Sequence, residues 1–173
     1  IPLNIFALSI FGDPIKMPVQ KHYYIHGMDL GSQELPNAKK ADVDTTLLIL
    51  GITTQAIKSS QMFYIKDNQI HQFKNSSWAI PISRMLTIAD FESLLESNIV
   101  SNLALQNINI KHDYSLFGTT GYGPILNDDR NNFSFYITFY LKNESTKKTA
   151  IKTFKYEQKY NNDELNASNY ATL

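Results

Sequence analysis

Histidine is the main residue type in this sequence that could carry chemistry. Cysteine is absent, which excludes disulfides, thiol catalysis, zinc-thiolate sites and iron–sulfur clusters. His22 and His26 have the spacing of a metal pair on a helix, but KHYYIHGMDL suits a strand, where that spacing separates them by roughly 13 Å. His71 and His112 lie in no H-E-x-x-H or G-x-S-x-G motif. We therefore predict a protein that is not an enzyme, with no catalytic residue, no metal site and no cofactor.

Two other segments contain residue types that bind ions in other proteins. GTTGYG, residues 118–123, is glycine-rich, but Pro124 and a polar loop follow it, so no helix presents its amides to a phosphate. NDDRNN, residues 127–132, is rich in oxygen ligands but lacks the spacing of a calcium loop. We interpret the first as a turn between strands and the second as a solvated hairpin loop.

Composition predicts one globular domain. A chain of 173 residues can bury roughly two-thirds of the surface that it would expose when unfolded. Lysine plus arginine and aspartate plus glutamate both number 16, so no basic surface for nucleic acid is expected. The longest apolar run, LNIFALSIF, is too short to span a bilayer. We expect residues 1–20 to form an N-terminal arm and residues 21–173 to form the domain.

The first half of the domain is expected to contribute two strands. KHYYIHGMDL, residues 21–30, has the tyrosine and isoleucine content of a strand, and the polar residues 31–44 predict a surface connection. Residues 45–54, TTLLILGITT, are apolar at nearly every position. This pattern predicts a central strand that is covered on both faces.

A hairpin and a helix are predicted next. Residues 62–66 are expected to pair with residues 69–73 across Asp67 and Asn68, because this pair tolerates the left-handed backbone of a tight turn.

The predicted helix runs from Ile82 to Ser97, with Pro81 in its first turn and Ser76 or Ser77 nearby as a cap. Its apolar stripe is expected to lie against the sheet. The acidic side chains are expected to face water, and they are Asp90, Glu92 and Glu96.

The last third gives the clearest local pattern. Residues 133–141, FSFYITFYL, alternate with period two, which is typical of a strand with one face in the core. A polar connection at 143–148 leads to a second alternating segment at 149–160, and together they predict a long antiparallel hairpin. Residues 161–173 begin like a capped helix, and we expect the natural domain to continue beyond them. The predicted fold class is α/β: a single domain with a mixed, partly antiparallel β-sheet flanked by helices.

Three aromatic residues are the candidate contact site. Tyr64, Phe73 and Trp78 lie on or beside the predicted hairpin, where they could form a rigid patch that contacts a protein partner or acyl chains. The alternative for Trp78 is a core position, because a large ring beside a helix entrance commonly seals a core edge.

The order of these segments resembles the ABC-type transport auxiliary lipoprotein family. This family includes the small lipoproteins that accompany mammalian-cell-entry (MCE) lipid transport systems and paraquat-inducible operons. LLILGITT, QMFYIKDNQIHQFKNSSWAIP, HDYSL, FSFYITFYLKN and KTAIKTFKY follow one another as in that family, over roughly residues 22–173. The matching residues are Met62, Tyr64 and Ile65, then Trp78 to Pro81, then Tyr114 and Leu116, and finally Phe154.

The resemblance implies a non-catalytic periplasmic protein at the outer membrane. Its partner would be the MCE-domain protein of an ABC-type transporter, and phospholipid or another hydrophobic cargo would be a further ligand. Ser77 stands where the family usually has arginine, Ile80 replaces an acidic residue, and the lipobox cysteine that would carry a lipid anchor is missing. The sequence also begins without methionine, so we expect a processed N-terminus.

Two alternatives remain from other functional classes. The first is an envelope or secretion-system assembly domain that has no role in lipid transport. The second is a small enzyme, which would gain support if His71 or His112 lay in a cleft against a buried acid.

Overall fold

A computed structural model describes residues 19–24, 45–54, 60–97, 99–106, 108–121, 125–130, 132–159 and 167. The elements are β1 (Lys21–Tyr23), β2 (Thr46–Thr54), β3 (Gln61–Lys66), β4 (Gln69–Trp78), α1 (Ile82–Ser97), β5 (Asn102–Leu105), β6 (Tyr114–Thr120), β7 (Ile125–Asn127), the 3₁₀ turn η1 (Asp128–Arg130), β8 (Asn132–Asn143) and β9 (Thr149–Lys159).

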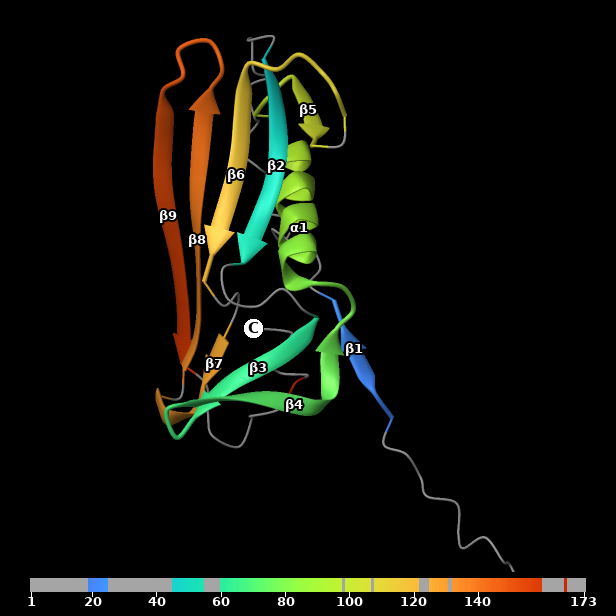
Figure 1. Cartoon of the computed structure of the whole chain (residues 1–173), viewed down its shortest axis with the longest axis vertical. Coiled ribbons are helices and arrows are strands. Elements are labelled where there is room, and N and C mark those ends of the chain that lie inside the picture. The colour runs from blue at the N-terminus through green and yellow to red at the C-terminus, as the bar shows by residue number, and fades with distance from the viewer. Residues whose placement is uncertain are drawn as a thin grey trace, which may run out of the picture.

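All nine described strands belong to one mixed sheet. Its order is β1-β4-β3-β7-β8-β6-β2-β5, and β9 pairs with β8. The β1–β4, β2–β5, β2–β6 and β3–β7 pairs are parallel, whereas β3–β4, β6–β8, β7–β8 and β8–β9 are antiparallel. Figure 1 shows that the long β8–β9 hairpin runs past both the β6–β2 part of the sheet and the β7–β3–β4 part. The prediction of a mixed, partly antiparallel sheet is confirmed, with one full helix in the described part of the chain.

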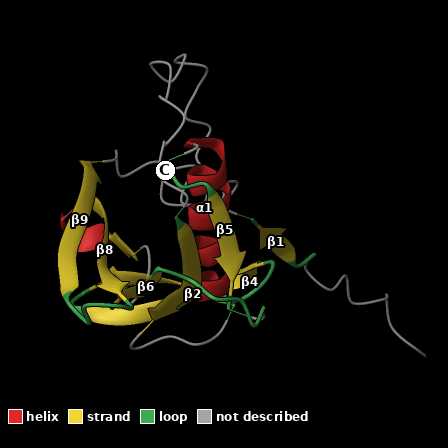
Figure 2. Cartoon of the chain, turned by 90° about the horizontal axis from the view of Figure 1, so that it is seen from above, coloured by secondary structure: helices red, strands yellow, loops and turns green. Residues whose placement is uncertain are grey.

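Helix α1 covers one face of the sheet. It lies against β2 and β5, at the side of the sheet away from β9 (Figure 2). The buried core between helix and sheet consists of Ile52, Met62, Trp78, Ile82, Met85, Leu86, Leu126, Phe133 and Ala167. This core joins the two parts of the sheet to the helix in one domain.

Helix α1 has the predicted bounds but not the predicted cap. The carbonyl oxygen of Pro81 accepts hydrogen bonds from the backbone N–H groups of Arg84 and Met85, at 2.9 and 3.2 Å. Ser76 and Ser77 lie instead in β4, which continues to Trp78. The serine prediction was wrong because β4 runs five residues beyond the predicted hairpin strand and uses both serines in its pairing with β1.

Two further segments differ from the sequence-based expectations. The first strand is only Lys21–Tyr23, and residues 25–44 lie outside the described residues. Gly118 to Thr120 belong to β6 rather than to a turn. The expected N-terminal arm and C-terminal helix also fall outside the described residues, apart from positions 19, 20 and 167.

A β-bulge in β2 is linked to the helix by a single hydroxyl group. The pairing register of β2 with β6 shifts between Ile49 and Gly51, and Gly51 has a φ of 100°. The hydroxyl oxygen of Thr87 accepts a hydrogen bond from the Ile52 N–H at 2.8 Å and donates one to the carbonyl of Ser83 at 2.8 Å. Thr87 therefore satisfies a backbone group that the bulge leaves without a ladder partner.

Replacing Thr87 with valine is expected to lower the free energy of unfolding by about 1 to 2 kcal/mol, because the Ile52 N–H would lose its acceptor. Urea denaturation of the purified chain measures this change. The Thr87→Ser variant keeps the hydroxyl and should lose less stability. Equal stability of the valine variant and the native chain would contradict the role of this hydroxyl.

Candidate functional site

The predicted aromatic site begins at the β3–β4 hairpin. Asp67 and Asn68 form its turn with φ angles of 51° and 57°, which confirms the predicted left-handed pair. The Tyr64 ring stacks on His71 with 5.3 Å between ring centroids, and it contacts Phe73 with 4.8 Å between centroids. Both Tyr64 and Phe73 are half-buried and pack against the core. The structure therefore brings these two predicted residues together.

Trp78 occupies a different environment from Tyr64 and Phe73. Its side chain is only 3% exposed and belongs to the core between α1 and the sheet. It is the last residue of β4, beside Tyr23 of β1, and its backbone N–H donates to the Ser60 carbonyl. In this conformation Trp78 is a core residue, so an open contact patch at the hairpin would rest on Tyr64 and Phe73.

The described histidines are spread over the molecule. His22 forms a hydrogen bond of 2.9 Å with the Ser77 hydroxyl, and His71 contacts the Lys66 carbonyl at 3.2 Å. His26, the other member of the spaced pair, lies outside the described residues. Among the residues that the structure describes, no group of three or more histidine, aspartate or glutamate side chains could hold a metal ion.

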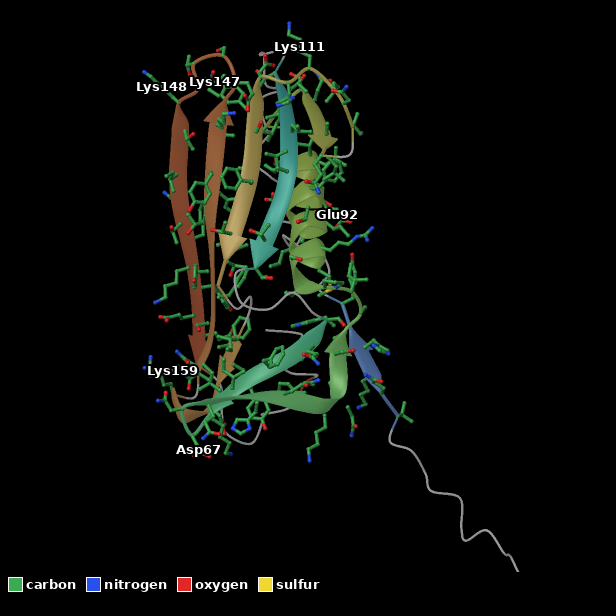
Figure 3. The ribbon with its side chains drawn as sticks, viewed as in Figure 1. Asp67, Glu92, Lys111, Lys147, Lys148 and Lys159 are labelled. Atoms are coloured by element: carbon green, nitrogen blue, oxygen red, sulfur yellow. The ribbon has the colours of Figure 1, made fainter. Side chains whose placement is uncertain are left out.

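A polar network surrounds Glu144 at the opposite end of the sheet. The Ser115 hydroxyl donates to the Glu144 carboxylate at 2.7 Å, and the Lys142 and Lys147 ammonium groups lie at 2.9 and 3.0 Å from it. A ring nitrogen of His112 lies 3.1 Å from the same serine oxygen. Figure 3 shows Lys111, Lys147 and Lys148 at this end of the molecule. The network joins the segment before β6 to the β8–β9 turn.

This network has the residue types of a catalytic triad in another arrangement. In a triad, histidine accepts the serine proton and the acid orients the histidine. Here the serine lies between the other two groups and donates its proton to Glu144. Hydrogen bonds from Lys142, Ser115 and Lys147 lower the pKa of Glu144 to about 2, so the carboxylate remains ionised at neutral pH. This arrangement is suited to holding two segments together.

The lowered pKa of Glu144 predicts a loss of stability in acid. Its pKa is about 2 in the folded chain and 4.5 ordinarily, so its contribution is complete above about pH 4.5 and is lost as the pH falls toward 2. The Glu144→Gln variant should therefore melt at a lower temperature than the native chain at pH 6, and this difference should shrink at pH 2.5. Thermal unfolding at a series of pH values measures it. Glu92→Gln, at an exposed glutamate of α1, is the matched control, and the same pH response from that control would contradict the role of Glu144.

The β8–β9 hairpin carries the largest group of exposed apolar side chains in the described part of the chain. All eleven residues of β9 are exposed. Five large side chains of the hairpin are between 38% and 63% exposed, and they are Tyr136, Leu141, Ile151, Phe154 and Tyr156. The register places Tyr136 and Ile151 on one face of the hairpin and Leu141, Phe154 and Tyr156 on the other. Exposed apolar side chains beside a sheet edge are typical of an interaction site.

Sequence reasoning placed β9 correctly but missed its exposure. Lys152 lies between Ala150 and Phe154 on one face of β9, and its ammonium group lies 5.7 Å from the centre of the Phe154 ring. A lysine within the apolar alternation was the available signal, because a charged residue is rarely buried without a partner.

The described part of the chain contains no helix with the length and apolar character needed to cross a membrane. No protein-family model matches the sequence, and a search of curated proteins finds no match.

Solved structures share the fold. One, described as an uncharacterized protein, has a TM-score of 0.62 and 14% sequence identity, over 90% of this chain and 88% of its own. A Xanthomonas campestris protein assigned to family model DUF330 has a TM-score of 0.59 and 17% identity, over 79% of this chain and 78% of its own. A Neisseria meningitidis lipoprotein has a TM-score of 0.42 and 8% identity, over 74% and 91%, which is too low to carry an argument. The first two similarities show that this chain shares its fold with those proteins.

Proposed function

We propose that this protein is a non-catalytic auxiliary component of an ABC/MCE-type lipid transport system. In this proposal it acts in the periplasm at the outer membrane, where it binds an MCE-domain partner and contacts phospholipid or another hydrophobic cargo. The observation that carries the proposal is the agreement between the sequence blocks of the family resemblance and the elements of the fold. The blocks coincide with β2, the β3–β4 hairpin, β6, β8 and β9, in that order.

Several of the residues that match the family lie in the core of the fold. Met62 and Trp78 are 0% and 3% exposed and lie together in the core. Leu116, another matching residue, is half-buried in β6. Residues at buried positions determine the fold. The resemblance therefore supports a shared fold more directly than it supports the binding of any particular ligand.

The exposed β8–β9 hairpin supports a binding role. It offers apolar side chains on a strand that is exposed along its whole length, whereas the polar network around Glu144 links two segments of the chain. A protein that binds a partner requires such a surface.

Purification from the envelope tests the proposal. The chain is expressed with its natural N-terminus in its own bacterium and purified from membranes in mild detergent, and proteins and lipids are identified by mass spectrometry. We expect an MCE-domain protein in stoichiometric amount, and bound phospholipid would place this chain on the lipid path. Recovery of the chain alone, free of lipid, would contradict the proposal. Recovery with another envelope assembly and no lipid would favour the assembly-domain alternative.

A further inference from the structure

Strand β9 forms an open edge of the sheet. It pairs with β8 over eleven consecutive residues, from Lys142↔Thr149 to Asn132↔Lys159. Within the described part of the chain, β8 is the only strand that pairs with it. In Figure 1, β9 lies at the outer edge of the sheet along the whole length of the hairpin. An edge strand of this length presents a row of backbone groups that another strand could pair with.

The register identifies the backbone groups that face outward. The Asn143 N–H donates to the Lys148 carbonyl at 2.9 Å, so this pair occupies a hydrogen-bonded position of the antiparallel ladder. Because hydrogen-bonded and non-hydrogen-bonded pairs alternate, every second residue of β9 directs its N–H and C=O away from β8. The outward residues are Thr149, Ile151, Thr153, Lys155, Glu157 and Lys159.

The positive charge of the β8–β9 turn and of β9 favours pairing with a strand that carries negative charge. Residues 144–159 contain five lysines and two glutamates, a net charge of +3 in a chain whose net charge is zero. Glu144 is already engaged by Lys142 and Lys147, and Glu157 by Lys155. Lys148, Lys152 and Lys159 have no ion-pair partner within the described residues, and Figure 3 shows Lys148 and Lys159 at opposite ends of β9.

We propose that the outer edge of β9 binds an extended, acidic segment of a partner protein, which adds a strand to the sheet. Backbone hydrogen bonds would supply the pairing. Acidic side chains at alternate positions would meet the face that carries Lys155 and Lys159, and the apolar residues between them would cover Phe154 and Tyr156 on the other face. The inference specifies the docking surface of the proposed function, and it rests on that function only for the identity of the partner.

A second copy of the chain fits this edge less well. Pairing two β9 strands would bring two strongly basic hairpins together, and like charges close to one another are unfavourable. Lysines on edge strands commonly prevent such edge-to-edge pairing between identical chains. The same lysines favour a strand of opposite charge.

A peptide binding experiment with the whole chain tests the inference. The probe is a fluorescein-labelled peptide of the same length as β9 in which glutamate alternates with valine, and its matched control has lysine in place of glutamate. Fluorescence anisotropy is expected to show binding of the acidic peptide only. Binding should weaken when salt is raised from about 50 to 300 mM, because the charges involved are exposed.

Variants separate backbone pairing from other contacts. Ile151→Pro removes an outward N–H without removing a hydrogen bond to β8, so it should weaken peptide binding about fivefold or more, while Ile151→Ala should have a smaller effect. Circular dichroism checks that each variant folds. If the proline variant does not fold, the double variant Lys155→Glu and Lys159→Glu provides the test, with an expected loss of about tenfold.

Several outcomes would overturn the inference. These are equal binding of the two peptides, no binding of either peptide, or an affinity that neither the proline variant nor the glutamate variant changes. Sedimentation that shows a dimer of the native chain and a monomer of Ile151→Pro would assign the edge to a second copy instead. Peptide binding without co-purification of an MCE protein would contradict the proposed function alone, whereas co-purification without peptide binding would contradict this docking surface alone.

Discussion

Replacing Trp78 with alanine is expected to lower the free energy of unfolding by about 3 to 5 kcal/mol. The Trp78 side chain is 3% exposed and lies in the core with Met62, Ile82 and Met85, each of which is at most 2% exposed. Truncation would leave a large cavity where the β1–β4 pair meets the start of α1. A loss of this size is a large fraction of the roughly 5 to 15 kcal/mol that stabilises a typical domain, so the variant is expected to unfold at a much lower denaturant concentration than the native chain.

Denaturant unfolding monitored by circular dichroism measures this effect. Tryptophan fluorescence cannot be used, because Trp78 is the only tryptophan in the chain. Trp78→Phe keeps part of the ring volume and should lose less stability. Ile70→Ala is the matched control in the same strand, because Ile70 is 49% exposed and its truncation should cost well under 1 kcal/mol. If Trp78→Ala and Ile70→Ala lost similar stability, Trp78 would not be the core anchor.

The best sequence-based predictions concerned elements with strong local patterns. The period-two alternation of residues 133–141 predicted β8, because a strand with one buried face must alternate apolar and polar side chains. Asp67 and Asn68 predicted the β3–β4 turn, because few other residues accept the left-handed backbone that it requires. Both features depend only on neighbours in the sequence.

Pairings between distant segments could not be predicted in the same way. The parallel β1–β4 and β2–β6 pairs join strands that are separated by other elements, and no local pattern specifies such partners. Gly118 was assigned to a turn because glycine is depleted in strands. Glycine occupies this position of β6 because of tertiary packing. A Cβ atom at Gly118 would lie 2.9 Å from Cγ1 of Ile52 and 3.4 Å from Cε1 of Phe139.

The aromatic contact site stays a prediction, and the structure shows where its residues lie. The aromatic content of the hairpin indicated Tyr64 and Phe73, which do contact each other. Sequence reasoning could not decide between surface and core for Trp78, because burial depends on how β1 and α1 pack beside it. The exposed edge at β9 was missed, since the position of a strand in a sheet depends on all the other pairings.

Asp90 is a carboxylate on the buried side of α1, although the sequence predicted that its side chain would face water. That expectation was wrong because Asp90 follows Ile82 and Leu86 at intervals of four, which places all three on one helix face. The Asp90 Oδ2 atom is buried and has no hydrogen-bond partner in the described part of the chain. Burial raises the pKa of Asp90 from 3.8 to about 6.

The raised pKa of Asp90 makes its ionised form destabilising at neutral pH. Below about pH 4, Asp90 is protonated in both the folded and the unfolded chain and has no effect. Between about pH 4 and 6, the unfolded chain ionises first, so stability falls as the pH rises, and above pH 6 the penalty is constant. Two pKa units correspond to about 3 kcal/mol, which solvent screening of this partly exposed group reduces to about 1 to 2 kcal/mol.

Asp90→Asn is therefore expected to stabilise the folded chain by about 1 to 2 kcal/mol at pH 7.5 and by a much smaller amount at pH 4. Urea denaturation of both proteins at the two pH values measures the difference. Glu96→Gln, at an exposed carboxylate in the last turn of the same helix, removes the same charge without relieving burial and should give no such pH dependence. A gain in stability that is equal at both pH values would show that the asparagine improves packing or helix propensity. Only a gain confined to the higher pH would show that the ionised form of Asp90, on the buried face of α1, opposes folding.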